Sequence, residues 1–303
     1  NEYKEMDPIA SIIITTFNRS KLLVERSLKS ALAQNFGDYE VIVVNDGGTD
    51  NTDEVMKQYP NVRYFNLGKD MGLSYARNFG IEKSRGKYIV CLDDDNELMP
   101  DFLKETVNNI GHFFAITTSR VIQYKEYAHR VTPRITKYTS IDWGWLIRRE
   151  VFDSIKYDEE LRANEDTDFG LRFFERFQAK VLDTPLQVAY DSDNPKDSLS
   201  YPDERELRGM ELFFKKNFHK YTEALELWHL YKLMGRKFYR GGQRLKGLGY
   251  FSKGFRVHPN PRSFLHLFFI LFGWTIYDLY MSLEERISAL CLFGFEEKEN
   301  RER

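Results

Sequence analysis

The sequence has 303 residues, of which 42% are hydrophobic and 30% are charged, so its composition excludes an intrinsically disordered chain. A chain of this length can form one large domain with a smaller addition. Its two cysteines, Cys91 and Cys291, exclude a disulfide framework and a cysteine-based zinc site, and with the polar stretch Asn1–Ala10 they favour a cytoplasmic protein over a secreted one.

The first hundred residues alternate between strand and helix patterns. Apolar, β-branched runs predict four strands, at Ile9–Thr16, Tyr39–Asn45, Val62–Asn66 and Lys87–Leu92. Helical patterns separate them, at Ser20–Gln34, after Thr49 and at Met71–Ser84. Strands that are apolar throughout and alternate with helices are typical of a mostly parallel sheet with helices on both faces. The sequence therefore predicts an α/β, Rossmann-like fold.

Polar residues follow three of these strands. Thr15–Arg19 ends the first strand, Asp46–Asp50 follows the second, and Asp93–Asp95 follows the fourth. Ligands of such sheets bind beyond the carboxyl ends of the strands, so these residues predict a binding site. Neither a G-x-G-x-x-G motif nor a P-loop follows the first strand, which argues against a dinucleotide-binding protein and a P-loop NTPase.

A mixed region and then a helical region complete the chain. Strands are predicted at Phe113–Tyr124 and Val181–Tyr190, a helix from Glu165 to about Phe177, and a polar linker over Ser192–Pro202. Further along, helices are predicted at Tyr201–Asn217, Thr222–Tyr239, Gln243–Val257 and Pro261–Met281. The last two could form an antiparallel pair. We therefore expect one domain over residues 1–200 and a helical region over residues 201–303.

The acidic run Asp93–Asp95 predicts a metal site. Three neighbouring carboxylates repel one another, so a cation or hydrogen-bond donors should accompany them. Carboxylate oxygens suit Mg²⁺ or Mn²⁺, which substrate phosphates often help to bind. An acidic surface turn is the alternative, and the apolar strand before the run makes it less favoured because that strand fixes the turn at the sheet edge.

Residue types alone leave three further features open. Arg77 follows small residues at a helix start, where it could bind a diphosphate or pair with Glu82 at the surface. Glu165 and Asp166 begin a helix, where acids either complement the helix dipole or supply a general base, whose pKa a neighbouring carboxylate would raise. Trp143 and Trp145 could form a platform for stacking a sugar or could belong to the core.

Five ordered motifs resemble those of the family 2 glycosyltransferases with the GT-A fold. The resemblance extends from about Pro8 to Tyr190, and the motifs are Ile12–Arg19, Val43–Asp50, Gly72–Gly86, Tyr88–Asp101 and Arg148–Arg172. It implies a mixed, mostly parallel sheet flanked by helices. It also implies that residues 1–95 bind a nucleotide-sugar donor and that residues 96–200 bind the acceptor.

The resemblance implies a role for each site residue as well. The donor would contact eight residues: Thr15, Thr16, Phe17, Arg19, Asp46, Arg77, Asp93 and Asp94. Among them, Asp46 would bind the base and Arg77 the diphosphate. Asp95 would bind the metal directly with Asp93 beside it, and Asp166, next to Glu165, would be the catalytic base.

Two observations bear on the acceptor and on the nucleoside. Trp143 and Trp145 lie in a stretch that varies with the acceptor in such enzymes, which favours the platform. The nucleoside preference stays open because three residues depart from the usual motif: Asn45, Gly48 and Asn96.

The resemblance implies an inverting transfer of one sugar, dependent on Mn²⁺ or Mg²⁺, from a nucleoside diphosphate sugar to a hydroxyl of a glycan or polyprenyl-linked acceptor. A UDP-sugar is favoured, and the lack of a Q-x-x-R-W motif argues against processive synthesis. A sugar nucleotidyltransferase would need a Gly-rich basic loop where Thr15–Arg19 stands. The pair Glu165 and Asp166 disfavours a non-catalytic scaffold. No nucleic-acid partner is expected.

The C-terminal region is basic and then apolar. Arg205–Arg262 contains fourteen Lys and Arg against four Asp and Glu, a local charge of +10 in a chain of net charge −2. This suggests an anionic partner or a solvated helix surface. Phe264–Met281 spans 18 residues that include His266 and Asp278, which favours internal packing, a homodimer contact or a helix lying on a membrane over a span. We expect a cytoplasmic enzyme, either free or peripheral at the inner membrane face.

Overall fold

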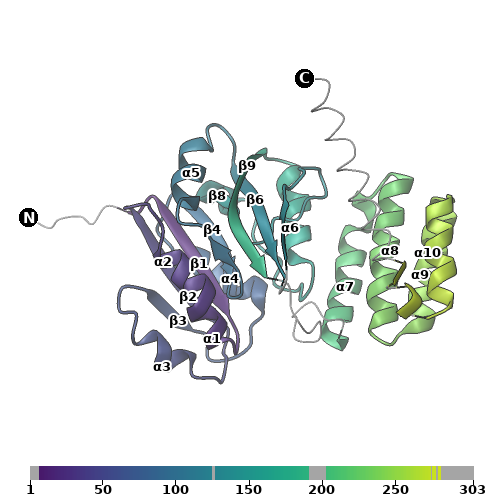
Figure 1. Ribbon diagram of the computed structural model, residues 1–303, viewed down its shortest axis with the longest axis horizontal. Coiled ribbons are helices and arrows are strands. Elements are labelled where there is room, and N and C mark those ends of the chain that lie inside the picture. Colours follow the sequence, from purple (N-terminus) through teal and green to yellow (C-terminus); the bar gives the residue numbers. More distant parts are fainter. Residues whose placement is uncertain (1–6, 125–126, 191–202, 274, 278, 281–303) are drawn as a thin grey trace, which may run out of the picture. The chain divides into compact units, whose positions relative to one another are not determined.

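The computed structural model describes residues 7–124, 127–190, 203–273, 275–277 and 279–280 (Figure 1). The chain divides into two compact units, Asn1–Leu199 and Ser200–Arg303. The first contains a sheet with flanking helices, and the described part of the second consists of helices. The predicted linker Ser192–Pro202 lies outside the described residues, as do Cys291 and Met281.

Four parallel strands form one side of the sheet. β1 (Ala10–Thr16) lies between β2 (Tyr39–Asn45) and β4 (Tyr88–Asp93), and β3 (Arg63–Asn66) pairs with the far side of β2. The register sets Thr15 beside Asp93 and Thr16 beside Asn45. The carboxyl ends of these strands therefore share one edge.

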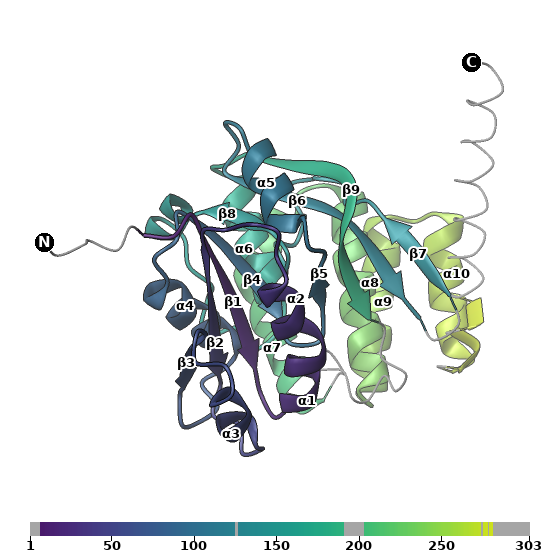
Figure 2. The same cartoon turned by 60° about the vertical axis from the view of Figure 1, so that its left-hand side comes forward.

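The other strands make the sheet mixed. β8 (Leu146–Arg148) runs antiparallel to β4, and the strand order continues with β6 (Ala115–Gln123), β9 (Ala179–Tyr190) and β5 (Glu97–Leu98). β7 (Ala128–Val131) pairs with β6 outside this path. Although β5 is last in the order, it packs against the helices that follow β1 (Figure 2). The sheet is therefore curled.

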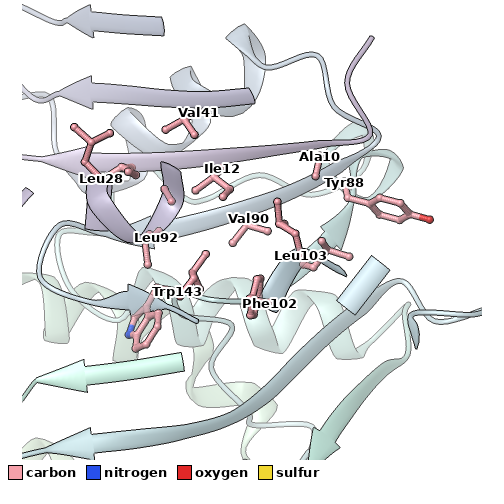
Figure 3. Close-up of a cluster of buried hydrophobic side chains, with 14 of the residues drawn as sticks. Ala10, Ile12, Leu28, Val41, Tyr88, Val90, Leu92, Phe102, Leu103 and Trp143 are labelled. Atoms are coloured by element: carbon pink, nitrogen blue, oxygen red, sulfur yellow. The ribbon is translucent and has the colours of Figure 1, made fainter. Parts of the chain in front are cut away.

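Alternate residues of β1 face opposite helical layers, because successive side chains of a strand point to opposite sides. Ile12 and Ile14 pack on one face (Figure 3), with η1 (Leu23–Leu28), α2 (Lys29–Leu32), α3 (Thr52–Met56) and α5 (Phe102–Asn109). The short α1 (Ser20–Leu22), which precedes η1, has no buried residue. Ile13 packs on the other, with α4 (Leu73–Lys83), η2 (Arg149–Asp153) and α6 (Glu165–Phe174). Both faces are buried, as the apolar strands predict.

The second unit contains α7 (Glu204–Asn217), η4 (Phe218–Lys220), α8 (Ala224–Arg240), α9 (Arg244–Val257) and α10 (Pro261–Leu271). Asp203 caps α7 and Asn260 caps α10 through their side chains. Among the residues that the structure describes, no helix is long and apolar enough to cross a membrane.

Several predicted boundaries need correction. The helix predicted over Ser20–Gln34 forms in three parts, with the π-helical η1 in the middle. The single helix predicted over Pro261–Met281 is wrong, because α10 ends at Leu271 and Gly273 adopts a φ of 105°. Periodicity does not predict β5, β7 or α5, of which the two strands have only two and four residues.

Candidate active site

The loop after β1 contacts the acidic run at the end of β4. The Thr16 hydroxyl donates to Asp94 Oδ2 at 2.8 Å. Arg19 Nη1 donates to Asp94 Oδ1 at 3.2 Å and to Asp95 Oδ2 at 2.9 Å. Asn18, whose φ is 55°, accepts from the backbone amides of Thr49 and Asp50 and so joins this loop to the one after β2. Three predicted donor residues thus meet at one sheet edge.

The carboxylates of the run differ in exposure. The Asp94 side chain is 6% exposed and that of Asp95 35%. Burial is the main cause that raises the pKa of Asp94 to about 7, with Asp95 adding to it and Arg19 opposing it. Arg26 donates to the Asp95 carbonyl at 3.1 Å, and its guanidinium lies 3.9 Å from the centre of the Tyr190 ring. The backbone of the turn is therefore held, while the Asp95 carboxylate is accessible.

Arg77 connects the acidic run with α6. Its side chain is 3% exposed; Nη2 donates to Asp93 Oδ1 at 2.9 Å and Nη1 to Glu165 Oε1 at 3.0 Å. Burial lowers its pKa, but the interactions with Asp93, Tyr157 and Glu165 outweigh burial and raise the pKa well above the usual value. The surface pair with Glu82 is therefore excluded, and Arg77 is a buried bridge between two carboxylates.

Asp166 follows Glu165 in the first turn of α6, after Asn164 in a left-handed conformation with a φ of 56°. Burial, followed by the charges of Glu165 and Asp142, raises the pKa of Asp166 to about 7. The Thr167 backbone amide donates to its carboxylate at 2.6 Å and opposes this shift. A carboxylate with a pKa near neutrality can accept a proton at physiological pH.

Asp142 and Arg120 form a pair that the sequence did not predict. Arg120 donates through both terminal nitrogens to the Asp142 carboxylate, at 2.8 and 3.1 Å. Asp142 also contributes to the raised pKa of both Asp93 and Asp166, so it lies close to the acidic run and to the start of α6. The sequence shows Asp142 directly before the Trp143–Trp145 stretch, which could have marked it as a site residue. Nothing in the sequence indicates that Arg120 is its partner.

Asp46 fixes the start of the helix that carries Arg77. Its two carboxylate oxygens accept from the backbone amides of Met71 and Gly72, both at 2.8 Å. Gly72 has a φ of 95°, and a Cβ there would lie 2.1 Å from Arg162 Nη1, so glycine is required. Base binding by Asp46 stays a prediction, to which the structure adds a role in positioning α4.

The remaining predicted donor residues flank this site. Thr15 is buried beside Asp93 in the β1–β4 register, and Phe17 is half-buried in the loop after β1. Their contacts with a donor stay predictions.

The two predicted platform residues are buried. Trp143 is 6% exposed and belongs to the core under α5 (Figure 3), and Trp145 is 2% exposed in the core of the opposite face. Arg120 lies over the Trp143 ring at 4.7 Å. Stacking on a sugar requires an accessible ring face. The burial of both indoles therefore favours the alternative that they are core residues.

The residues at the acidic run fit a divalent cation that a substrate helps to bind. Among the described residues, no three His, Cys, Asp or Glu side chains are grouped as a complete metal site. Asp95 offers accessible carboxylate oxygens next to Asp93 and Asp94, which are the hard ligands that Mg²⁺ and Mn²⁺ prefer. Since these ions commonly use one or two carboxylates plus phosphate oxygens, a site with few protein ligands is sufficient.

The sequence matches known transferases. The family model described as glycosyl transferase family 2 matches residues 11–177. The uncharacterized glycosyltransferase EpsJ of Bacillus subtilis is 27% identical over 230 residues, 65% of this chain and 65% of that protein. The GalNAc(5)-diNAcBac-PP-undecaprenol beta-1,3-glucosyltransferase of Campylobacter jejuni is 32% identical over 124 residues, 39% of this chain and 40% of its own. The chain thus spans less than two thirds of the length of these relatives.

Two solved structures share the fold. Staphylococcus aureus TarS 1-349 in complex with UDP-GlcNAc gives a TM-score of 0.58 at 18% identity, covering 84% of this chain and 82% of that one. The mannosyltransferase PcManGT of Pyrobaculum calidifontis, in complex with GDP-Man and Mn²⁺, gives 0.58 at 14% identity, covering 95% and 87%. With the curled mixed sheet and its flanking helices, these likenesses confirm the predicted GT-A fold and its helical C-terminal region.

Proposed function

Because the chain belongs to glycosyl transferase family 2, we propose that it moves one sugar, with inversion, from a nucleoside diphosphate sugar to a hydroxyl group of a glycan or lipid-linked acceptor. One observation carries this proposal. Arg77 hydrogen-bonds both Asp93, in the acidic run, and Glu165, the neighbour of Asp166. The proposed metal site and the neighbour of the proposed base therefore lie on two sides of one guanidinium, which supports the proposal.

Asp166 is the catalytic base in this proposal. Its carboxylate takes the proton of the acceptor hydroxyl while the acceptor oxygen forms a bond to the anomeric carbon. The bond between that carbon and the diphosphate oxygen breaks, and the electron pair leaves with the nucleoside diphosphate. Attack from the side opposite the leaving group inverts the anomeric configuration. The raised pKa of Asp166 supports this role because a carboxylate with an ordinary pKa is a weaker base.

The acidic run serves the donor. Asp95, with Asp93 beside it, would hold Mn²⁺ or Mg²⁺, and when bound such an ion neutralises charge on the departing diphosphate. The Mn²⁺ in PcManGT supports this choice of cofactor. Arg19 is partly exposed and would contact donor phosphates. Because Arg77 is buried and both its terminal nitrogens contact carboxylates, we assign it a positioning role instead of the diphosphate contact that the motif implies.

The substrates are proposed by chemistry and by similarity. A UDP-sugar is favoured because Asp46 suits a pyrimidine imide and TarS 1-349 binds UDP-GlcNAc, whereas PcManGT binds GDP-Man. The name of the Campylobacter relative gives a lipid-linked acceptor, which supports that class of acceptor here. A cytoplasmic enzyme would meet both substrates at the inner membrane face.

Release of the nucleoside diphosphate tests the proposal. The full chain is incubated with UDP-, GDP- and dTDP-sugars, Mn²⁺ and a glycan or lipid-linked acceptor. We expect release from one donor class, loss of release in Asp95→Ala and Asp166→Ala, and a product whose NMR spectrum shows an inverted anomer. Glu82→Gln, which removes an exposed acid of α4, is the matched control and should keep full activity.

Three outcomes would contradict the proposal. Donor binding in calorimetry with no release from any donor would indicate a scaffold. Formation of pyrophosphate from a nucleoside triphosphate and a sugar phosphate would indicate a nucleotidyltransferase. Full activity of either Ala variant would refute the assigned roles.

A further inference from the structure

An exposed apolar surface lies on α10 and the residues after it. Seven large apolar side chains between residues 264 and 279 are each at least 38% exposed: Phe264, Leu265, Phe268, Leu271, Phe272, Ile276 and Leu279. Phe264, Leu265, Phe268, Leu271 and Phe272, on α10 and at its C-terminal end, lie within about a third of the helix circumference, and we call these five the α10 outer face. The other side of the segment is already packed, because His266, Ile270 and Tyr277 are buried. A helix that is apolar on all sides normally has neighbours on all sides, so this face lacks a cover among the described residues.

The packing of α8 and α9 explains why this exposure is unusual. Gly235 faces the Phe251 ring, where a Cβ would come within 2.8 Å, and Gly247 faces the backbone of Tyr239. Residues of α8 and α9 have the spacing of a helix pair in helical-repeat proteins. They are Tyr231, Met234, Gly235 and Phe238 in α8, Gly247 and Phe251 in α9, and Pro259 after α9. In such arrays each helix pair buries its faces against its neighbours. α10 follows the pair, and its outer face is apolar and uncovered among the described residues.

Basic side chains adjoin the α10 outer face, and we call them the basic border: Lys232, Arg256 and Arg262, with His229 and His258 beside them. Arg262 is exposed in the first turn of α10, two residues before Phe264. Burial lowers the pKa of His229, and the charges of Lys232, Arg262 and His258 lower it further, so these four groups lie close together. Phe255 of α9 contacts Phe264, with ring centres 6.3 Å apart, which brings the end of α9 to the same border. Arg256 follows Phe255 and is exposed.

We propose that the α10 outer face and its basic border dock this protein on an anionic lipid bilayer. The apolar side chains would enter the acyl boundary while the border meets lipid phosphates. α10 has 11 residues, which as a helix extend about 16 Å, too short for a bilayer core of about 30 Å, so the helix lies in the interface. A second copy fits less well, because it would account for the apolar face alone, whereas an anionic bilayer accounts for the apolar face and the basic border together.

Vesicle co-sedimentation tests the docking. The full chain should sediment with vesicles that contain phosphatidylglycerol and not with vesicles of phosphatidylcholine alone. Phe264→Ser with Phe268→Ser should weaken binding at least about tenfold. Arg256→Gln and Arg262→Gln should each weaken it roughly fivefold and reduce its salt dependence. Leu245→Ser is the matched control, because Leu245 is 87% exposed in the first turn of α9 and is not part of this face.

The variants must keep their fold and their turnover of a soluble acceptor, which separates a failure of docking from a failure of the proposed transferase activity. Equal vesicle binding by wild type and the double Phe variant would overturn the proposal. A dimer in sedimentation velocity that the double variant abolishes, without vesicle binding, would assign the face to a second copy. A monomer that binds no vesicle would overturn it as well.

Discussion

Two arginines at the same sheet edge each contact two carboxylates, and they differ in what they join. Arg77 is 3% exposed and links Asp93 of β4 with Glu165 of α6. Arg19 is 17% exposed and contacts two successive acids of one turn. A buried bridge between distant segments cannot exchange its partners without unfolding its surroundings, whereas a partly exposed one can. The difference suggests a fixed frame on the Arg77 side and an exchangeable contact on the Arg19 side.

Removing Asp166, the proposed base beside the buried Arg77 contacts, should have the largest effect. In Asp166→Asn, we expect kcat to fall by about 10²–10⁴, the range for loss of a general base. The thermal midpoint should not fall, since the amide needs no neutralising charge. Glu82→Gln serves as the control in the same assay. A variant that retains more than about a tenth of wild-type turnover would place the base elsewhere.

The two arginines can be compared directly. Arg77→Met leaves two carboxylates without their buried partner, so the free energy of unfolding should fall by about 3–5 kcal/mol. Arg19→Met should reduce it less, because Asp94 keeps its hydrogen bond from Thr16 and Asp95 is 35% exposed, and should instead raise the KM for the donor. Urea denaturation and donor kinetics measure both. Equal losses of unfolding free energy in Arg77→Met and Arg19→Met would refute the distinction between a fixed frame and an exchangeable contact.

The pH dependence follows from the raised pKa of Asp166, whose ordinary value is 3.8 and whose folded value is about 7. The base acts only when deprotonated, so kcat/KM should fall about tenfold per pH unit once the pH is well below 7. The free energy of unfolding changes with pH in the opposite direction. The folded state holds this proton more tightly than the unfolded chain, so the stabilising contribution is complete below about pH 4 and is lost as the pH rises towards 7.

Asp142→Asn should give the smallest effect and the most specific one. Removing this charge, and leaving Arg120 unneutralised, both lower the pKa of Asp166. The acid limb of the kcat/KM profile should therefore move to lower pH, with a modest change at the plateau. Asp168→Asn is the control, since Asp168 pairs with Arg172 within α6 and is not among the main causes of the raised pKa of Asp166. If the acid limb of the kcat/KM profile does not move, Asp142 does not act on the pKa of Asp166.

Local sequence patterns predict the parallel strands and the acidic run, because hydrophobic periodicity and turn residues depend only on neighbouring positions in the chain. The apolar runs place β1, β2 and β4 within one or two residues of their observed bounds. Burial of side chains is not local, which is why residue types left Arg77 and the two tryptophans open. The Arg120–Asp142 pair joins β6 to the loop before β8, a contact set by the antiparallel insertion of β8 between β4 and β6. No single-sequence pattern encodes that insertion.

The curl of the sheet limits how the catalytic unit can be recombined with its relatives. Two residues after Asp95 the chain enters β5, where Glu97 pairs with Val188 of β9. Arg26, from the first half of the unit, contacts both the Asp95 carbonyl and the Tyr190 ring. A chimera joined between residues 95 and 96 would therefore take Arg26 and the Tyr190 ring from different parents, and likewise Ser30 and Leu98, whose backbone amide donates to the Ser30 hydroxyl at 3.2 Å. The proposed donor and acceptor contacts should therefore be tested by point substitution, not by swapping halves.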